Sequence, residues 1–231
     1  MAAYLQRLPF EATVITEELL MQTIFIHGLG QAPSSWDKTI AGLSEQITSQ
    51  CPDLSQFLKG AESTYENLYR GFSEYCYKFS DPVNLCGLSL GAVLALNYAV
   101  DNPCKVSSLV LTAPQFEMPK KLLKFQNMIF RIMPESAFRE TGFGKKDFIT
   151  LTNSMADLNF RKGLKKVLCP ALILCGEKDK ANRKAAIKLA QLLPDAELRF
   201  VENSGHEVNA DAPDRLAEIT ENFYEGIFDR S

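Results

Sequence analysis

Apolar residues along the chain form short continuous runs that are separated by longer amphipathic stretches. Continuous runs of this kind are typical of parallel strands buried on both faces of a sheet. We therefore predict strands over residues 23–26, 83–86, 106–112, 171–175 and 197–201, and a weaker strand near 56–58.

Between these runs, apolar residues recur every three or four positions, the spacing of an amphipathic helix. Trp36, Ile40, Leu43 and Ile47 follow it, which predicts a helix over 36–47. Strands alternating with helices predict an α/β fold with a doubly wound, mostly parallel sheet, and the length of 231 residues fits a single domain over 1–231. The same reasoning predicts further helices over 65–79, 92–100 and 182–193, and a last one after Pro213.

Residues 114–166 interrupt this alternation, because they contain no convincing strand and have helical patterns. Gly142–Gly144 marks a break between two helices, so we predict a helical insertion between two strands. The first helix of the insertion places several residues on the face of Phe125, namely Leu122, Gln126, Ile129, Ile132 and Met133.

The insertion is also basic. It holds eleven Lys or Arg residues against five acidic ones, although the whole chain has a net charge of −3. A solvated helical exterior explains such a charge run, and attraction of an anionic substrate is the functional alternative.

Composition excludes several classes of protein. Apolar residues make up 46% of the chain and charged residues 23%, which argues against a disordered protein, and the negative net charge argues against nucleic-acid binding. No apolar run is long enough to span a membrane, and Met1–Arg7 does not resemble a signal peptide. Six cysteines without a Cys-x-x-Cys pair, beside only two histidines, predict reduced thiols, no metal, no cofactor and a cytoplasmic location.

Gly87-Leu88-Ser89-Leu90-Gly91 fits the pattern G-x-S-x-G between a predicted strand and a predicted helix. That context favours a nucleophilic serine on a tight turn, where glycines avoid clashes with the neighbouring strand and helix. We predict Ser89 as the nucleophile.

A serine nucleophile needs a base, and a carboxylate must orient that base. His206 follows the last predicted strand, and Asp179 follows the strand over 171–175, so both should lie with Ser89 at the carboxyl edge of the sheet. Glu177 is the reserve choice for the acid. Asp211 and Asp214 are expected instead at the start of the final helix, where they suit its dipole.

The order Ser89, Asp179, His206 resembles that of the α/β-hydrolase superfamily, and the likeness covers nearly the whole chain. His27-Gly28-Leu29-Gly30, followed by Trp36, resembles the family's H-G-x-G loop. The resemblance implies an oxyanion hole formed by the backbone N–H groups of Leu29 and Leu90, and a structural role for His27.

By the same resemblance, residues 114–166 correspond to a small cap over the serine. Its apolar face would wall an acyl pocket or serve only for packing. The chain departs from the family before Thr23, where about twenty residues leave the leading strands short or missing. A small cap also suggests an open pocket and a modest substrate.

These features predict a serine hydrolase that cleaves a small carboxylic ester or thioester through an acyl-enzyme. Amide, lactone and carbon–carbon bond hydrolysis stay open, because a fold does not fix a function. A lyase or synthase that uses the triad for proton transfer is one alternative, and a ligand-binding protein with incidental turnover is another. The expected partner is a small molecule, with no nucleic acid and no membrane span; the sequence does not indicate an oligomeric state.

Overall fold

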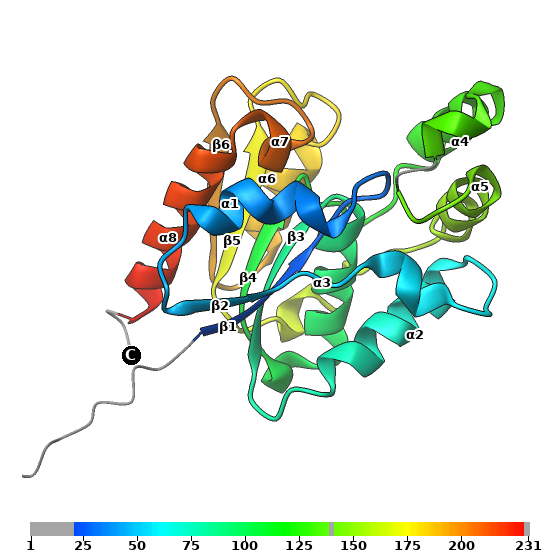
Figure 1. Ribbon diagram of the computed structural model, residues 1–231. Coiled ribbons are helices and arrows are strands. Elements are labelled where there is room, and N and C mark those ends of the chain that lie inside the picture. Colours follow the sequence, from blue (N-terminus) through cyan, green and yellow to red (C-terminus); the bar gives the residue numbers. More distant parts are fainter. Residues whose placement is uncertain (1–20, 139–140, 229–231) are drawn as a thin grey trace, which may run out of the picture.

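The computed structural model describes residues 21–138 and 141–228, and its centre is a six-stranded sheet (Figure 1). All neighbouring strands pair in parallel, in the order β2-β1-β3-β4-β5-β6. This confirms the prediction of a parallel α/β sheet. The strands are β1 (Met21–Ile26), β2 (Ile47–Gln50), β3 (Val83–Leu88), β4 (Val106–Thr112), β5 (Ala171–Gly176) and β6 (Ala196–Val201).

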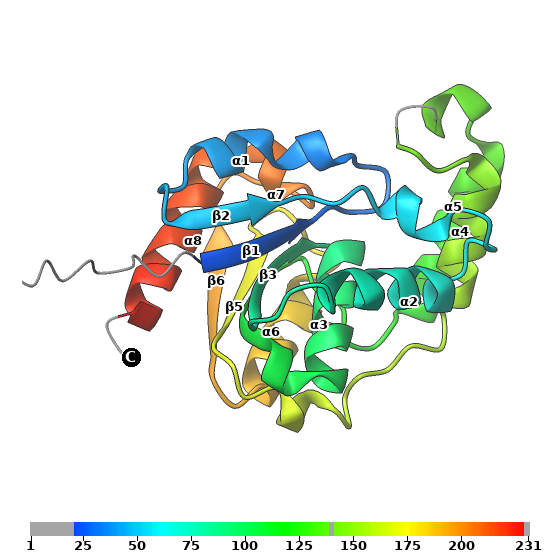
Figure 2. The ribbon, with the colours of Figure 1, turned by 60° about the horizontal axis from the view of Figure 1, so that its bottom comes forward.

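Helices cover both faces of this sheet (Figure 2). The short α1 and α7 lie with the long α8 on one face, and α2, α3 and α6 lie on the other. Between β4 and β5, α4 and α5 project beyond the end of the sheet (Figures 1 and 2). The helices are α1 (Asp37–Ala41), α2 (Tyr65–Cys76), α3 (Leu90–Asp101), α4 (Lys120–Ile132), α5 (Lys145–Ser154), α6 (Arg183–Leu192), α7 (Val208–Asp211) and α8 (Pro213–Phe228).

Alternation of side chains along the strands divides the core in two. On β1, Phe25 packs with Trp36 towards α1 and α8, whereas Ile24 and Ile26 face the layer of α2, α3 and α6. Every residue of β3 and β5 is buried, so these strands read as continuous apolar runs. Burial on both faces fixes the carboxyl ends of the strands, from which the candidate site residues come.

The segment between β1 and β3 differs from the prediction. The helix expected over 36–47 ends at Ala41, with Gly42 as its C-cap. Gly42 packs closely on α8, since an added Cβ would lie 2.9 Å from the Ala217 Cβ. Ile47 instead opens β2 and pairs with Met21. Its helical spacing from Trp36 is therefore coincidental.

The strand expected near 56–58 is also wrong. Leu54–Leu58 forms a 3-10 helix, and Leu54 and Leu58 are both buried. Apolar residues spaced in this way bury one face of a helical turn, whereas a strand would have needed alternation. The strand that follows β1 along the chain is instead β2, at one edge of the sheet.

The face predicted for α4 is also partly wrong. Leu123 and Asn127 are the buried residues of α4, whereas the side chains of Phe125 and Ile132 are 54% and 80% exposed. The helix carries apolar residues on two faces, and periodicity alone does not show which face packs. The prediction that the leading strands before Thr23 are short or missing concerns residues 1–20, which lie outside the described part of the chain, so β1 is the first strand described.

Candidate active site

Ser89 lies at the turn from β3 into α3, the place that the G-x-S-x-G pattern predicts. Its backbone has φ 54° and ψ −111°, a conformation that residues other than glycine rarely adopt, and its N–H donates to the Thr112 carbonyl at 2.9 Å. A Cβ on Gly91 would lie 2.0 Å from the Ile26 carbonyl oxygen. Glycine at this position therefore lets α3 begin directly against β1 and leaves the serine at the tip of the turn.

His206 and Asp179 meet at the carboxyl ends of β6 and β5. Nδ1 of His206 lies 2.9 Å from Oδ2 of Asp179. Asp179 is 7% exposed, whereas the His206 side chain is 44% exposed. Burial alone would raise the pKa of Asp179, but the hydrogen bonds from His206 and Asn182 outweigh it and hold that pKa below its usual value.

The loops that carry these two residues are in direct contact. A Cβ on Gly176 would lie 1.9 Å from the Gly205 carbonyl oxygen, so only glycine allows this approach. Asp211 Oδ2 accepts a hydrogen bond from the Gly205 N–H at 2.7 Å. Asp211 is the last residue of α7, not a residue at the start of the final helix, and it anchors the histidine loop. Asp214 does lie in the first turn of α8, as predicted.

Glu177, the reserve choice for the acid, points elsewhere. It is exposed, and its Oε2 accepts a hydrogen bond from the Asn203 N–H at 3.2 Å. Of the two acidic residues after β5, Asp179 is therefore the one that contacts His206.

Asn182 is a site residue that the sequence did not reveal. Its Nδ2 lies 2.7 Å from Asp179 Oδ2 and 3.1 Å from His206 Nδ1, and its backbone N–H donates to Asp179 Oδ1 at 3.1 Å. Its own Oδ1 accepts a hydrogen bond from Gln115 at 2.6 Å. An Asn three positions after an acid resembles any polar residue at a helix start, so no sequence signal separated it from a cap.

The loop after β1 is braced by buried polar contacts. His27 is fully buried; its Nδ1 lies 2.9 Å from the Gly28 carbonyl, and its Nε2 accepts from the Leu54 N–H at 3.2 Å. Burial lowers the pKa of His27, which keeps the ring neutral. Gln31 links the same loop to Asn209 of α7 at 3.0 Å. These contacts fix the position of Leu29 beside the serine.

A cavity of about 190 Å³ joins these elements. Ser89 and His206 line it together with Leu29 and Leu90. Within residues 21–138 and 141–228, the backbone N–H groups of Leu29 and Leu90 donate to no protein acceptor. Two such N–H groups beside a serine can stabilise a developing oxyanion.

The segment between β4 and β5 forms the outer wall of this cavity. The wall is largely apolar, although Gln126 of α4 and Thr152 of α5 add polar groups. The apolar lining residues from this segment are Ala113, Met118, Pro119, Leu122, Leu123, Phe130 and Met155.

Among the described residues, no group of three or more His, Cys, Asp or Glu side chains could hold a metal ion. In the same part of the chain, no helix is both long enough and apolar enough to cross a membrane.

Comparison with known proteins establishes the family. The model of the alpha/beta hydrolase family matches residues 23–219. The chain belongs to the alpha/beta hydrolase family. This membership confirms the resemblance inferred from the four sequence motifs.

Individual relatives in this family are distant. The human monoacylglycerol lipase ABHD6 is 21% identical over 88% of this chain and 75% of its own length. The mouse protein is 22% identical over 63% of this chain, and that match spans only 49% of the mouse protein.

Solved structures show the same fold. A lipase from Acinetobacter baumannii, described as putative in its name, has a TM-score of 0.72 at 22% identity and covers 91% of this chain and 85% of its own. A structure from a study of carboxylesterases of Nitrososphaera gargenis has a TM-score of 0.76 at 16% identity, with 93% of each chain covered.

Proposed function

We propose that the protein is a serine hydrolase that cleaves small carboxylic esters or thioesters. The observation that carries this proposal is one cavity lined by Ser89 and His206, with His206 held by the buried Asp179. Membership of the alpha/beta hydrolase family supports it, as do the names of the lipases and esterases to which the chain is similar.

In the proposed reaction, Ser89 Oγ attacks the carbonyl carbon while His206 removes the hydroxyl proton. Asp179 keeps the histidine in the tautomer that can accept this proton, and it stabilises the imidazolium that forms. The negative charge on the carbonyl oxygen is stabilised by the N–H groups of Leu29 and Leu90. His206 then protonates the leaving group. In the second half of the reaction His206 removes a proton from the attacking water and returns it to Ser89 Oγ as the acyl–oxygen bond breaks and the carboxylic acid leaves.

The cavity supports a modest acyl group as the substrate's apolar part. Its volume of about 190 Å³ lies below the usual range of about 300–1,000 Å³ for drug-sized ligands. The helical segment from about 114 to 166 serves in this proposal as the cap, because α4 and α5 supply the apolar wall opposite the serine.

The test compares Ser89→Ala with wild type and with Ser34→Ala, which removes an exposed hydroxyl outside the cavity. We expect wild type and Ser34→Ala to hydrolyse p-nitrophenyl or coenzyme A esters and to be labelled by a fluorophosphonate probe. Ser89→Ala should do neither while unfolding at a similar temperature, because it lacks only the nucleophilic oxygen.

Labelling that persists in Ser89→Ala would contradict the assignment of the nucleophile. Turnover without an initial burst of leaving group would favour a lyase or synthase. Stabilisation by an ester without any turnover would favour a ligand-binding protein.

A further inference from the structure

The outward face of α4 carries a stripe of exposed apolar side chains. Phe125, Met128 and Ile132 are 54%, 56% and 80% exposed. Their spacing of three and seven positions places them on one side of the helix. They are three of the five large hydrophobic side chains that are exposed in the described part of the chain; the other two, Tyr77 and Leu168, lie outside α4.

This stripe is not needed to pack α4 onto the molecule, because the opposite face does that. Leu123 and Asn127 are buried there, and Asn127 Nδ2 donates to Asn153 Oδ1 of α5 at 2.5 Å. The ring of Phe130 packs edge-on against Phe148 with a centroid distance of 5.2 Å. The inner face is therefore complete, and the outer apolar side chains gain nothing from the fold.

The charged residues of α4 are likewise not explained by folding of the helix. The helix contains Lys120, Lys121, Lys124 and Arg131 and no acidic residue. Two of these cations, Lys120 and Lys121, lie in the first turn of the helix, where positive charge opposes its dipole. Among the described residues, only Lys120 of the four pairs with a carboxylate, that of Asp157. Helix stability therefore does not explain the lysines.

The stripe also borders the candidate active site. At 100° per residue, Leu122 and Gln126 lie on one flank of Phe125, and both line the cavity with Ser89. Lys124 and Arg131 lie on the other flank. Apolar residues thus lie between the cavity wall and a basic edge, at the end of the molecule where α4 projects (Figure 1).

We propose that α4 docks onto an anionic lipid surface. Phe125, Met128 and Ile132 enter the apolar boundary, and Lys121, Lys124 and Arg131 contact the negatively charged headgroups. α4 itself carries four positive charges and no negative one, whereas the whole chain has a net charge of −3, so the rest of the chain carries a net −7 and is repelled by the same surface. That asymmetry orients the molecule with α4 and the cavity wall towards the lipid.

A second copy of the chain fits this face less well. Symmetric pairing through the stripe would bring two α4 helices together, each with four cations and no acid. The proposal rests on the ester hydrolase function only for its purpose, which is to bring the cavity close to small esters that partition into lipid. Binding itself does not require Ser89.

The experiment measures flotation of the full chain with vesicles of phosphatidylcholine, with and without phosphatidylglycerol. Wild type and Ser89→Ala should bind the anionic vesicles alike, and added salt should weaken that binding. Phe125→Ser/Ile132→Ser and Lys124→Glu/Arg131→Glu should each weaken it about tenfold or more. Neither pair lines the cavity, so hydrolysis of a water-soluble ester should be unchanged.

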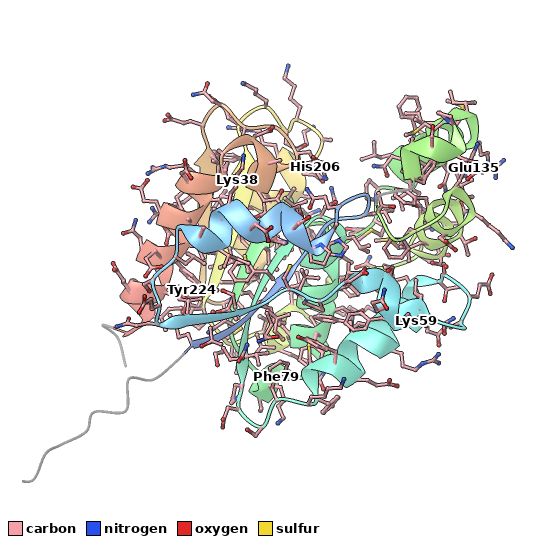
Figure 3. The ribbon with its side chains drawn as sticks, in the orientation of Figure 1. Lys38, Lys59, Phe79, Glu135, His206 and Tyr224 are labelled. Carbon is pink, nitrogen blue, oxygen red and sulfur yellow. The ribbon has the colours of Figure 1, made fainter. Side chains whose placement is uncertain are left out.

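Two controls match these variants. Leu168→Ser removes an exposed apolar side chain away from α4. Lys38→Glu/Lys78→Glu changes the net charge by the same amount as Lys124→Glu/Arg131→Glu, but Lys38 lies in α1 and Lys78 follows α2. Figure 3 shows Lys38 well separated from Glu135, which follows α4. Both controls should bind vesicles as wild type does.

Absence of wild-type binding to anionic vesicles would overturn the proposal, as would equal losses in the controls. A wild-type dimer that Phe125→Ser/Ile132→Ser converts to a monomer, without vesicle binding, would also overturn it in favour of a second copy. Vesicle binding without hydrolysis of any ester would leave the docking intact and contradict the proposed function instead.

Discussion

At Ser89 the backbone conformation that exposes the side chain also costs free energy. With φ 54° and ψ −111°, a residue with a Cβ is strained by about 1–3 kcal/mol, and glycine is not. Glycine loses more conformational entropy on folding, which offsets part of that relief. We therefore expect Ser89→Gly to be about 1 kcal/mol more stable than Ser89→Ala, a rise in melting temperature of about 2–4 °C. Calorimetry of the two variants measures this, and equal melting temperatures would show that the turn is not strained.

The carboxylate of Asp179 is held by two side chains and one backbone N–H, and this predicts a ranking of variants. Asp179→Asn should lose orders of magnitude in kcat, because the amide favours the wrong tautomer of His206; the known serine protease case is about 10⁴. Asn182→Ala removes one hydrogen bond to Asp179 and should cost about tenfold in kcat with little change in KM. Glu177→Gln should have almost no effect.

Steady-state kinetics with one soluble ester test this ranking. A larger loss from Glu177→Gln than from Asp179→Asn would mean that the acid is wrongly assigned. A change in KM but not in kcat for Asn182→Ala would mean that Asn182 only contacts substrate.

At the scale of elements, the site depends on how closely the loops after β5 and β6 approach each other. Gly176→Ala would place a Cβ 1.9 Å from the Gly205 carbonyl, so the two loops must separate. We expect a loss of several kcal/mol in stability and a large loss of activity, since Asp179 and His206 lie on these loops. Thermal unfolding and ester hydrolysis measure the two effects.

Gly226→Ala is the matched control for this prediction. Gly226 lies in α8 with no atom within 4 Å of an added Cβ, so alanine should stabilise the helix by about 1 kcal/mol and leave activity unchanged. A Gly176→Ala variant as stable and as active as Gly226→Ala would mean that the loops are not in close contact.

The elements that the sequence predicted best are those with one dominant local signal. The strand over 106–112 was predicted with the bounds of β4, because all of its residues except Ser107 are buried. Ile47 was misplaced because an apolar residue that pairs in β2 happened to continue a helical spacing. The face of α4 predicted around Phe125 was only partly right, because that helix has two apolar faces. Periodicity shows that a face is apolar, and only tertiary packing shows what covers it.

At the scale of the whole molecule, the candidate site could be assembled from the sequence because a parallel sheet gathers its strand ends. Ser89, Asp179 and His206 follow β3, β5 and β6. Because these strands are parallel, their carboxyl ends lie at the same edge of the sheet. Asn182 and the link from Gln31 to Asn209 could not be predicted, because each depends on side-chain geometry between elements distant in sequence.

The pKa values of the buried titratable groups lead to one prediction about how the rate depends on pH. The lowered pKa of Asp179 keeps its carboxylate charged, and burial raises the pKa of Cys76 to about 12 and of Cys175 to about 11. These three groups should not change charge between about pH 5 and 8, the range in which histidine ordinarily does. Burial lowers the pKa of His27, so this ring favours its neutral form more than an exposed histidine does.

His206 is then the base on which the proposed reaction depends. It must be neutral to accept the proton of Ser89, so the rate should be low in acid and higher towards neutral pH. Asp179 contributes stability that is present above the usual pKa of a carboxyl and is lost only in stronger acid, so the acid limb of the rate should precede unfolding. Measuring kcat/KM and unfolding across this range, with and without EDTA, tests both points. A rate that falls as pH rises, or that EDTA abolishes, would contradict a mechanism based on serine and histidine.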